Sequence, residues 1–150
     1  GNAHTEAVRA AIANEHAEML IVAASAEADI AELETFEERQ MCLQDMGLDG
    51  SGVSRRIKAA YRLLDLQTFF TTGADESRAW TFRRGMKAPE TAGIIHTDFE
   101  RGFIRAEVIT YADYVELGSE RACRDVGKIG IEGKEYVVEE GDIMHFLFNV

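Results

Sequence analysis

The basic residues in the middle of the chain are the strongest candidates for a binding function. Arginine and lysine neutralise phosphates, so a shared face would bind RNA, whereas the same residues spread over a surface are ordinary solvated side chains. Both interpretations stay open at this stage. Interleaved aromatic side chains are expected to fill the core, because large aromatics dominate burial in small domains. The basic set is Arg78, Arg83, Arg84, Lys87, Arg101 and Arg105, and the aromatics are Trp80, Phe82, Phe99 and Phe103.

Metal binding has weak support. His96, Asp98, Cys123 and His145 are of ligand type, but only the first two lie close in sequence, and structural sites usually contain tight ligand pairs. We therefore predict no metal site. His96 is expected to be a hydrogen-bonded corner residue at a helix end, and His145 to pair across a sheet. No Ser/His/Asp or Cys/His order indicates nucleophilic catalysis.

Nucleotide hydrolysis lacks its usual sequence elements. The chain has no GxxxxGK[ST] loop, and no GxGxxG follows a strand. Without backbone amides and a lysine around the phosphates, we predict that the chain does not hydrolyse nucleotides by itself and holds no cofactor. Its two cysteines, Cys42 and Cys123, are far apart and lack a CxxC pattern, so reduced thiols are expected.

Composition and charge narrow the function classes. The 150 residues are 46% apolar and 29% charged, which is typical of a soluble globular protein with one or two small domains. No apolar run approaches the roughly 20 residues of a membrane span, and no signal peptide is evident, so we expect a cytoplasmic protein without membrane contact. The net charge of −11 argues against whole-surface attraction to nucleic acid. Residues 51–106 nevertheless carry +4 between acidic flanks.

The elements that must position these residues centre on a corner at residues 92–108. Thr97 and Glu100 have the spacing of a capping pair, and Gly102 is predicted to end the turn in a left-handed conformation. A strand should follow at once, with alternate residues facing a core and solvent. The inward set is predicted to be Ile104, Ala106 and Val108, and the outward set Arg105 and Glu107.

The first half of the chain has the pattern helix, strand, helix, helix. Residues 5–17 are predicted to be helical, and the apolar run at 19–24 suits a strand covered on both faces. Helix should resume from Glu27, with Thr35 and Glu38 as a capping box, and again over residues 53–64. A lone strand leaves its backbone groups unpaired. We therefore expect the chain to be the C-terminal piece of a longer α/β protein, with segment 19–24 pairing with a second copy, covered by helices, or rearranged.

The second half changes to short strands. Strands are predicted at residues 67–71 and 78–84, joined by a hairpin through Gly73, Ala74 and Asp75. A helix should start near Lys87, and an irregular segment with one or two helical turns should span 113–126. The remaining strands are predicted at 103–111, 129–131, 136–138 and 143–148, with the last central in the sheet. One helix across several strands indicates an α+β, β-grasp (ubiquitin-like) fold.

Three blocks of sequence carry a family resemblance. RAWTFRRGMKAPETA (78–92), GIIHTDFERGFIRAEV (93–108) and GKEYVVEEGDIMHFLFNV (133–150) occur in this order. They resemble the terminal TGS domain of the YchF-type, Obg-like ATPases. The resemblance extends over nearly the whole chain. It implies that residues 1–65 are the end of a P-loop nucleotide-binding domain and that residues 66–150 are a β-grasp TGS domain.

The resemblance also implies functions for the intact parent. That protein would be a P-loop ATPase that uses ATP and Mg²⁺, associates with ribosomes or RNA, and takes part in translation or stress responses. By position, Ala23, Ala24 and Ser25 would belong to the loop that flanks the bound base, at the strand end where α/β ligands sit. The alternative is that Ser25 merely caps the next helix.

Two rival interpretations come from other classes. A β-grasp module can bind protein partners through a sheet face, and an acidic surface repels RNA. Steep salt dependence of binding would separate RNA recognition from this alternative. An accessory domain of a tRNA synthetase or a stringent-response enzyme would share the fold. Its sequence, however, would not resemble residues 77–93 preceded by the helices predicted in the first half of this chain.

Overall fold

The computed structural model describes residues 2–48, 50–73 and 76–149. The chain divides into two compact units, Gly1–Leu64 and Asp65–Val150. None of the helices formed by the described residues has the length and apolar character needed to cross a membrane.

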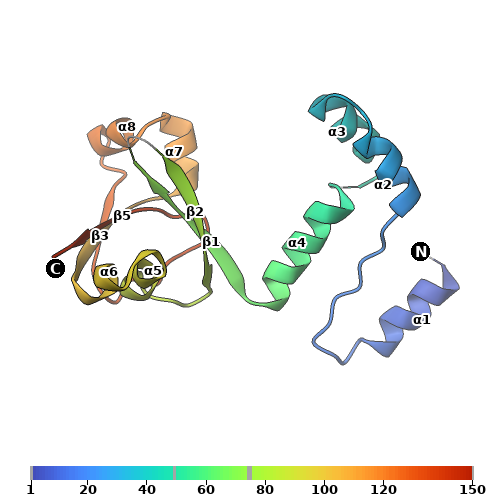
Figure 1. Cartoon of the computed structure of the whole chain (residues 1–150), viewed down its shortest axis with the longest axis horizontal. Helices are drawn as coiled ribbons and strands as arrows, with labels where there is room; N and C mark the ends of the chain where they lie inside the picture. The colour runs from blue at the N-terminus through green and yellow to red at the C-terminus, as the bar shows by residue number, and fades with distance from the viewer. Residues whose placement is uncertain (1, 49, 74–75, 150) are drawn as a thin grey trace. The chain divides into compact units, whose positions relative to one another are not determined.

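The first unit is helical (Figure 1). Its helices begin at the capping residues that the sequence offers: the Asn2 side chain accepts from the Thr5 N–H, and Thr35 and Glu38 form the predicted capping box. Ser51 caps the last helix through the Ser54 N–H. The helices are α1 (Ala3–Ala11), α2 (Ala24–Ala31), α3 (Phe36–Asp45) and α4 (Gly52–Leu63).

The strand predicted at 19–24 is wrong. Residues 17–23 form neither helix nor strand, and α2 already begins at Ala24, three residues before the predicted start at Glu27. The exposed fractions of Ile21 and Val22 are 45% and 42%. A strand needs a neighbour for its N–H and C=O groups, and the described residues of this unit supply none. Pairing of this segment with a second copy stays a prediction.

The first unit buries little apolar surface. Among its described residues, the buried apolar side chains are those of Leu43 and Ala59. The predicted apolar stripe on α4 exists, but Val53 and Ile57 are 55% and 54% exposed. Helices gain most of their stability from packing an apolar face, so the exposed stripe on α4 contributes little to the stability of this unit.

A five-stranded sheet forms the centre of the second unit (Figure 1). Its order is β2-β1-β5-β3-β4, so the last strand is central, as predicted. The β1 and β5 strands are parallel, and the other neighbours are antiparallel. The predicted hairpin residues Ala74 and Asp75 lie outside the described residues. The strands are β1 (Leu66–Thr72), β2 (Ser77–Arg83), β3 (Phe103–Ile109), β4 (Gly130–Glu132) and β5 (Ile143–Phe148).

Helix α5 (Ala88–Ile95) packs against one face of the sheet and, with α6 (Thr97–Arg101), lies on that side in Figure 1. Pro89 occupies its first turn, and the Glu90 carboxylate accepts from the Lys87 N–H at 2.7 Å. The predicted α+β, β-grasp fold is therefore confirmed. The core under α5 contains Phe69, Phe82, Ala92, Phe103, Ala106, Val108, Val138, Met144 and Phe146, with Trp80 and Phe99 partly buried against it.

The other face of the sheet is covered at one end. Ile109 and Ile143 pack there with Cys123, which comes from α8 (Glu120–Asp125). Helix α7 (Tyr111–Leu117) ends at Gly118, whose φ of +78° is left-handed, so the segment predicted to be irregular contains two short helices. The strand predicted at 136–138 is reduced to a single bridge between Val137 and Lys87.

The corner at residues 92–108 differs from its prediction in two contacts. The N-cap of α6 is His96, whose Nδ1 accepts from the Asp98 N–H at 3.2 Å, so Thr97 begins the helix instead of capping it. The expected corner role of His96 is confirmed. Gly102 has φ of −90° and is not left-handed. A side chain there would collide with the backbone of Asn149, which explains the glycine.

A bulge changes the facing of the strand that follows. The pairing of β3 with β5 shifts register between Phe103 and Arg105. Phe103 consequently takes the inward place, while Ile104 is 56% exposed, contrary to the predicted alternation. Ala106 and Val108 are buried as predicted.

Candidate functional site

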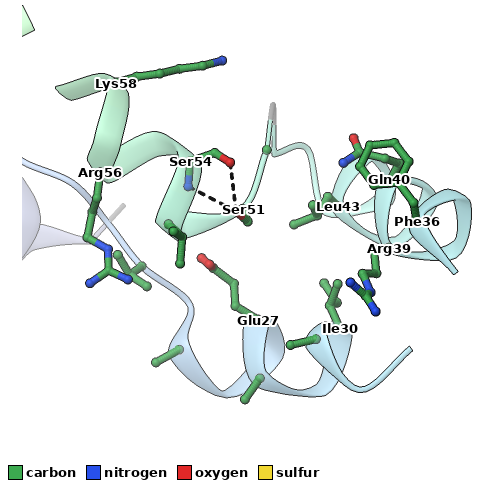
Figure 2. Close-up of a pocket in the computed structure, with 16 residues that line it drawn as sticks. Glu27, Ile30, Phe36, Arg39, Gln40, Leu43, Ser51, Ser54, Arg56 and Lys58 are labelled. Carbon is green, nitrogen blue, oxygen red and sulfur yellow. Dashed lines mark hydrogen bonds between the residues drawn. The ribbon is translucent and has the colours of Figure 1, made fainter. Parts of the chain in front are cut away.

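A hollow of about 740 Å³ lies among α2, α3 and α4 of the first unit (Figure 2). In the figure, Phe36 and Gln40 border it from α3, and Arg56 and Lys58 lie on α4. Its walls are mainly apolar, and Glu27, the one carboxylate among the described residues that line it, is held by other groups. The apolar wall includes Val22, Ala24, Ile30, Phe36, Leu43 and Val53.

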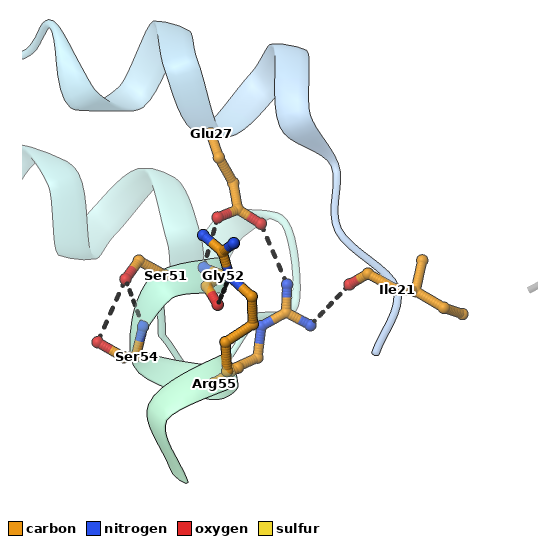
Figure 3. Close-up of polar contacts among 7 residues, drawn as sticks. Ile21, Glu27, Ser51, Gly52, Ser54 and Arg55 are labelled. Atoms are coloured by element: carbon orange, nitrogen blue, oxygen red, sulfur yellow. Dashed lines mark hydrogen bonds and ion pairs between the residues drawn. The ribbon is translucent and has the colours of Figure 1, made fainter. Parts of the chain in front are cut away.

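Glu27 links α2 to the start of α4 (Figure 3). Its Oε2 accepts from the Gly52 N–H, and its Oε1 is 3.1 Å from Arg55 Nη2. Arg55 Nη1 donates to the carbonyl oxygen of Ile21 at 3.0 Å. The Glu27 and Arg55 side chains are only 14% and 24% exposed. Helix α4 is thus tied both to α2 and to the irregular segment before it.

A second arginine of α4 holds the same segment further upstream. Arg62 donates from Nε and Nη2 to the two carboxylate oxygens of Glu18, at 2.9 Å and 2.6 Å. This hydrogen-bonded pairing lowers the pKa of Glu18 and raises that of Arg62. The arginine side chain is 60% exposed, so solvent weakens this pair more than the Glu27 pair.

The three residues proposed to flank a base lie at the start of α2. Ala23 is the N-cap residue and forms no side-chain cap bond, Ala24 is the first helical residue and lines the hollow, and Ser25 is exposed. The alternative role of Ser25 as N-cap is wrong, because the helix begins before it. All three lie between Ile21 and Glu27, the two residues that Arg55 contacts.

The six basic residues of the second unit do not gather into one patch. Arg83 pairs with the first residue of β1, four residues before the position where β1 meets β5. Arg105 pairs with Leu147 of β5, four residues beyond that position. The two therefore lie about eight residues apart along the strands, or about 26 Å. Arg84 and Lys87 follow Arg83 in the turn before α5, and Arg101 is the last residue of α6.

Several of these cations already have partners. Arg84 Nε lies 3.2 Å from Asp65 Oδ1, and Lys87 Nζ lies 2.5 Å from Glu135 Oε2, which raises the pKa of the lysine. The Arg78 guanidinium sits 4.9 Å above the Trp80 ring. Among the described residues, Arg83, Arg101 and Arg105 have no ion-pair partner within 4.0 Å, and all three are exposed.

The face of the sheet opposite α5 carries a polar group that sequence spacing could not reveal. Glu107 of β3 lies opposite His145 of β5, so the predicted cross-sheet pairing of His145 is confirmed. Arg124 of α8 reaches Glu107 at 2.7 Å. This hydrogen bond, aided by the charges of His145 and Arg105, lowers the pKa of Glu107. Arg124 is 17 residues from Glu107 in sequence, and only the fold joins them.

The residues considered for metal binding are dispersed. Within the described ranges, no group of three or more His, Cys, Asp and Glu side chains could hold an ion. His96 lies at the α5–α6 corner and His145 on β5. Cys123 is buried, with its Sγ donating to the Asp113 carbonyl at 3.7 Å, and both Cys42 and Cys123 are free thiols.

Comparison with known proteins places this arrangement in a family. Residues 66–149 match the family described as "YchF-GTPase_C: Protein of unknown function (DUF933)". The "Ribosome-binding ATPase YchF" of Bacillus subtilis is 53% identical over 150 residues, which are 100% of this chain and 41% of that protein. The "Obg-like ATPase 1" of Gallus gallus is 52% identical over 113 residues, covering 75% of this chain and 28% of its own length.

A solved structure gives the same result. The Schizosaccharomyces pombe YchF GTPase has a TM-score of 0.80 to this chain, with 36% identity, covering 97% of this chain and 39% of the yeast protein. The chain therefore spans about two fifths of the length of the relatives that match it throughout. Together with the described sheet, these matches show that the chain belongs to the YchF-type, Obg-like ATPase family and corresponds to its C-terminal part.

Proposed function

We propose that this chain is the ribosome-facing and regulatory end of a cytoplasmic, YchF-type ATPase involved in translation or stress responses. Residues 66–150 would be the TGS domain that contacts ribosomal RNA, and residues 1–65 the end of the nucleotide-binding domain. Support comes from relatives named as ribosome-binding ATPases that match the chain over its full length.

Hydrolysis of ATP with Mg²⁺ would belong to the parts of the relatives that this chain does not span. The residues present here do not by themselves form a binding site for ATP or for Mg²⁺. The hollow in the first unit has mainly apolar walls, and Glu27 is already bound by Arg55 and the Gly52 N–H. We propose a smaller contribution to nucleotide binding, in which Ala23, Ala24 and Ser25 flank the base.

The observation that carries RNA contact is the exposure of unpaired arginines on the second unit. Arg83 and Arg105 lie on the sheet face opposite α5, and Arg101 is the last residue of α6. An exposed guanidinium without a carboxylate partner is available to a phosphate, whereas a paired one must first give up its partner. Arg84 and Lys87 are therefore expected to contribute less than Arg83 and Arg105.

Cosedimentation with ribosomes at low salt tests this assignment. Arg83→Glu and Arg105→Glu should each weaken binding several-fold, because each replaces a phosphate contact by repulsion. Arg84→Glu and Lys87→Glu serve as matched controls of identical charge change and should weaken binding less. Equal losses in all four variants, or none, would contradict the assignment.

Protein recognition is the second candidate, favoured by exposed apolar side chains beside Arg105. Ile104 is 56% exposed, and Ile131 of β4, which lies opposite Glu107, is 63% exposed. An apolar contact to a protein partner would survive moderate salt and would be lost in Ile131→Asp. RNA binding should show the reverse pattern: it should weaken as the salt concentration rises, and a small polar residue in Ile131→Ser should have little effect on it.

A further inference from the structure

We propose that Arg55 and Glu27 are positioning residues for recognition of the nucleotide base in the intact ATPase. They would hold Ala23, Ala24 and Ser25 in place by fixing the chain on both sides of these residues. The inference rests on the proposed function, because it takes these three residues as the base-flanking loop. It adds a role for helix α4, which lies outside that loop.

Side-chain hydrogen bonds hold this loop within the part of the chain that the structure describes. Residues 17–23 form no strand, and the described residues of the first unit offer them no ladder partner. Ile21 and Val22 are close to half exposed, so packing also restrains them weakly. The hydrogen bond from Arg55 Nη1 to the Ile21 carbonyl, at 3.0 Å, fixes the backbone two residues before Ala23.

The far side of the loop is fixed through the same arginine. Arg55 Nη2 lies 3.1 Å from Glu27 Oε1, and Glu27 follows Ser25 by two residues on α2. The other oxygen of this carboxylate accepts from the Gly52 N–H at the start of α4. One guanidinium thus joins the two ends of a seven-residue stretch, 21–27, and its bond geometry sets their separation (Figure 3).

Burial makes this arrangement more rigid than a surface ion pair. The Glu27 and Arg55 side chains are 14% and 24% exposed, so water competes little for their hydrogen bonds. Gly52 permits the close approach, because a Cβ at that position would lie 2.7 Å from Glu27 Oε1. Arg62 and Glu18 provide a weaker, more exposed second attachment of α4 to the same stretch of chain.

The test uses the intact ATPase that contains this chain and separates base recognition from phosphate binding. Affinities for ATP and for inorganic tripolyphosphate, which lacks a base, are measured by competition with a fluorescent adenine nucleotide. Arg55→Met and Glu27→Gln should each weaken ATP binding about three- to tenfold and leave tripolyphosphate binding unchanged. The double variant should lose no more than the worse single variant, because both act through one contact. Arg9→Met, which removes an arginine paired with Glu6 within α1, is the control.

Arg55→Lys provides a graded check. A single ammonium cannot reproduce the fork that reaches both Ile21 and Glu27, so ATP affinity should lie between wild type and Arg55→Met. Equal loss of ATP and tripolyphosphate affinity would show a general structural role and overturn the inference. So would normal ATP affinity in both Arg55→Met and Glu27→Gln.

A substitution inside the loop distinguishes the positioning role from the base-loop proposal on which it depends. Ser25→Arg should weaken ATP binding if the loop flanks the base. If Ser25→Arg weakens ATP binding and Arg55→Met does not, the positioning role is wrong and the base-loop proposal stands. If Ser25→Arg and Ala24→Arg both leave ATP affinity unchanged, the base-loop proposal itself fails and the positioning role fails with it.

Discussion

Asp142 is the one charged residue that is buried among the described residues of the chain, at 3% exposure. Its Oδ2 accepts from the Tyr136 hydroxyl and from the Glu139 N–H, both at 2.9 Å. Burial raises the pKa of this carboxyl above its ordinary 3.8, and the two hydrogen bonds oppose the rise without cancelling it. The pKa of Tyr136 is also raised, first by burial and then by its bond to Asp142.

A pH dependence follows from the raised pKa of Asp142. The folded state binds the proton more tightly than the unfolded state, so this group's contribution to the free energy of unfolding falls as pH rises from about 3.8 through the folded pKa. Asp142→Asn keeps an acceptor oxygen and removes the titration. Relative to wild type, the variant should therefore gain stability as pH rises through this window, measured by urea unfolding at each pH. A relative loss over the same range would contradict the raised pKa.

Gly102 and Gly118 require glycine for different reasons, and alanine should reveal the difference. At Gly102 a Cβ would collide with the Asn149 backbone although φ is ordinary, so the β5 end must shift. At Gly118 the space is open but φ is +78°, and alanine should cost only about 1 kcal/mol.

We expect Gly102→Ala to lower the free energy of unfolding by about 2 kcal/mol, the range typical of overpacking. Amide hydrogen exchange should show the damage at the Asn149 N–H, which donates to the Gly102 carbonyl at 2.9 Å. Gly118→Ala should leave that amide protected. Protection of Asn149 in both variants would mean that the collision is relieved without cost.

At the scale of secondary-structure elements, two threonines have the same spacing to a glutamate, but only one of them caps a helix. Thr35 accepts from the Glu38 N–H at 3.2 Å and starts α3, whereas Thr97 is displaced as a cap by the His96 side chain. Thr35→Ala should destabilise its helix by about 1 kcal/mol, and Thr97→Ala by much less. Amide exchange at Glu38 and at Glu100 compares the two. Faster exchange at Glu100 than at Glu38 after the matched substitutions would contradict the assigned caps.

The elements that the sequence predicted well are those whose signals are local. Lys87 to Glu90 specify a helix start through proline and a capping glutamate, and β5 is apolar on both faces as a central strand requires, so both follow from short-range chemistry. The bulge at Ile104 and the cap at His96 depend on contacts with β5 and with the turn itself. Segment 19–24 has strand-like composition, but composition cannot provide the neighbour that a strand requires.

At the scale of the whole molecule, sequence spacing also failed to predict which candidate site residues lie close together. The six basic residues look clustered in sequence because residues 51–106 are locally basic. Sheet topology then separates Arg83 from Arg105 by about 26 Å along the strands. Conversely, Arg55 and Glu27 are 28 residues apart and carry no motif, yet the fold joins them. Pairing across such distances is set by packing, which spacing alone does not encode.

The partners that Arg84, Lys87 and Arg78 already have predict a shallow salt dependence for ribosome binding. Each phosphate contact contributes about −0.7 to −0.9 to the slope of log K against log salt concentration. Contacts from Arg83, Arg101 and Arg105 alone give a slope of about −2 to −3, whereas a patch of all six basic residues gives about −4 to −5. Binding is measured over a potassium chloride series at fixed magnesium, with Arg105→Gln expected to reduce the slope by about 1. A slope near about −5 would mean that the paired cations also bind phosphate, and a slope near zero would favour protein recognition.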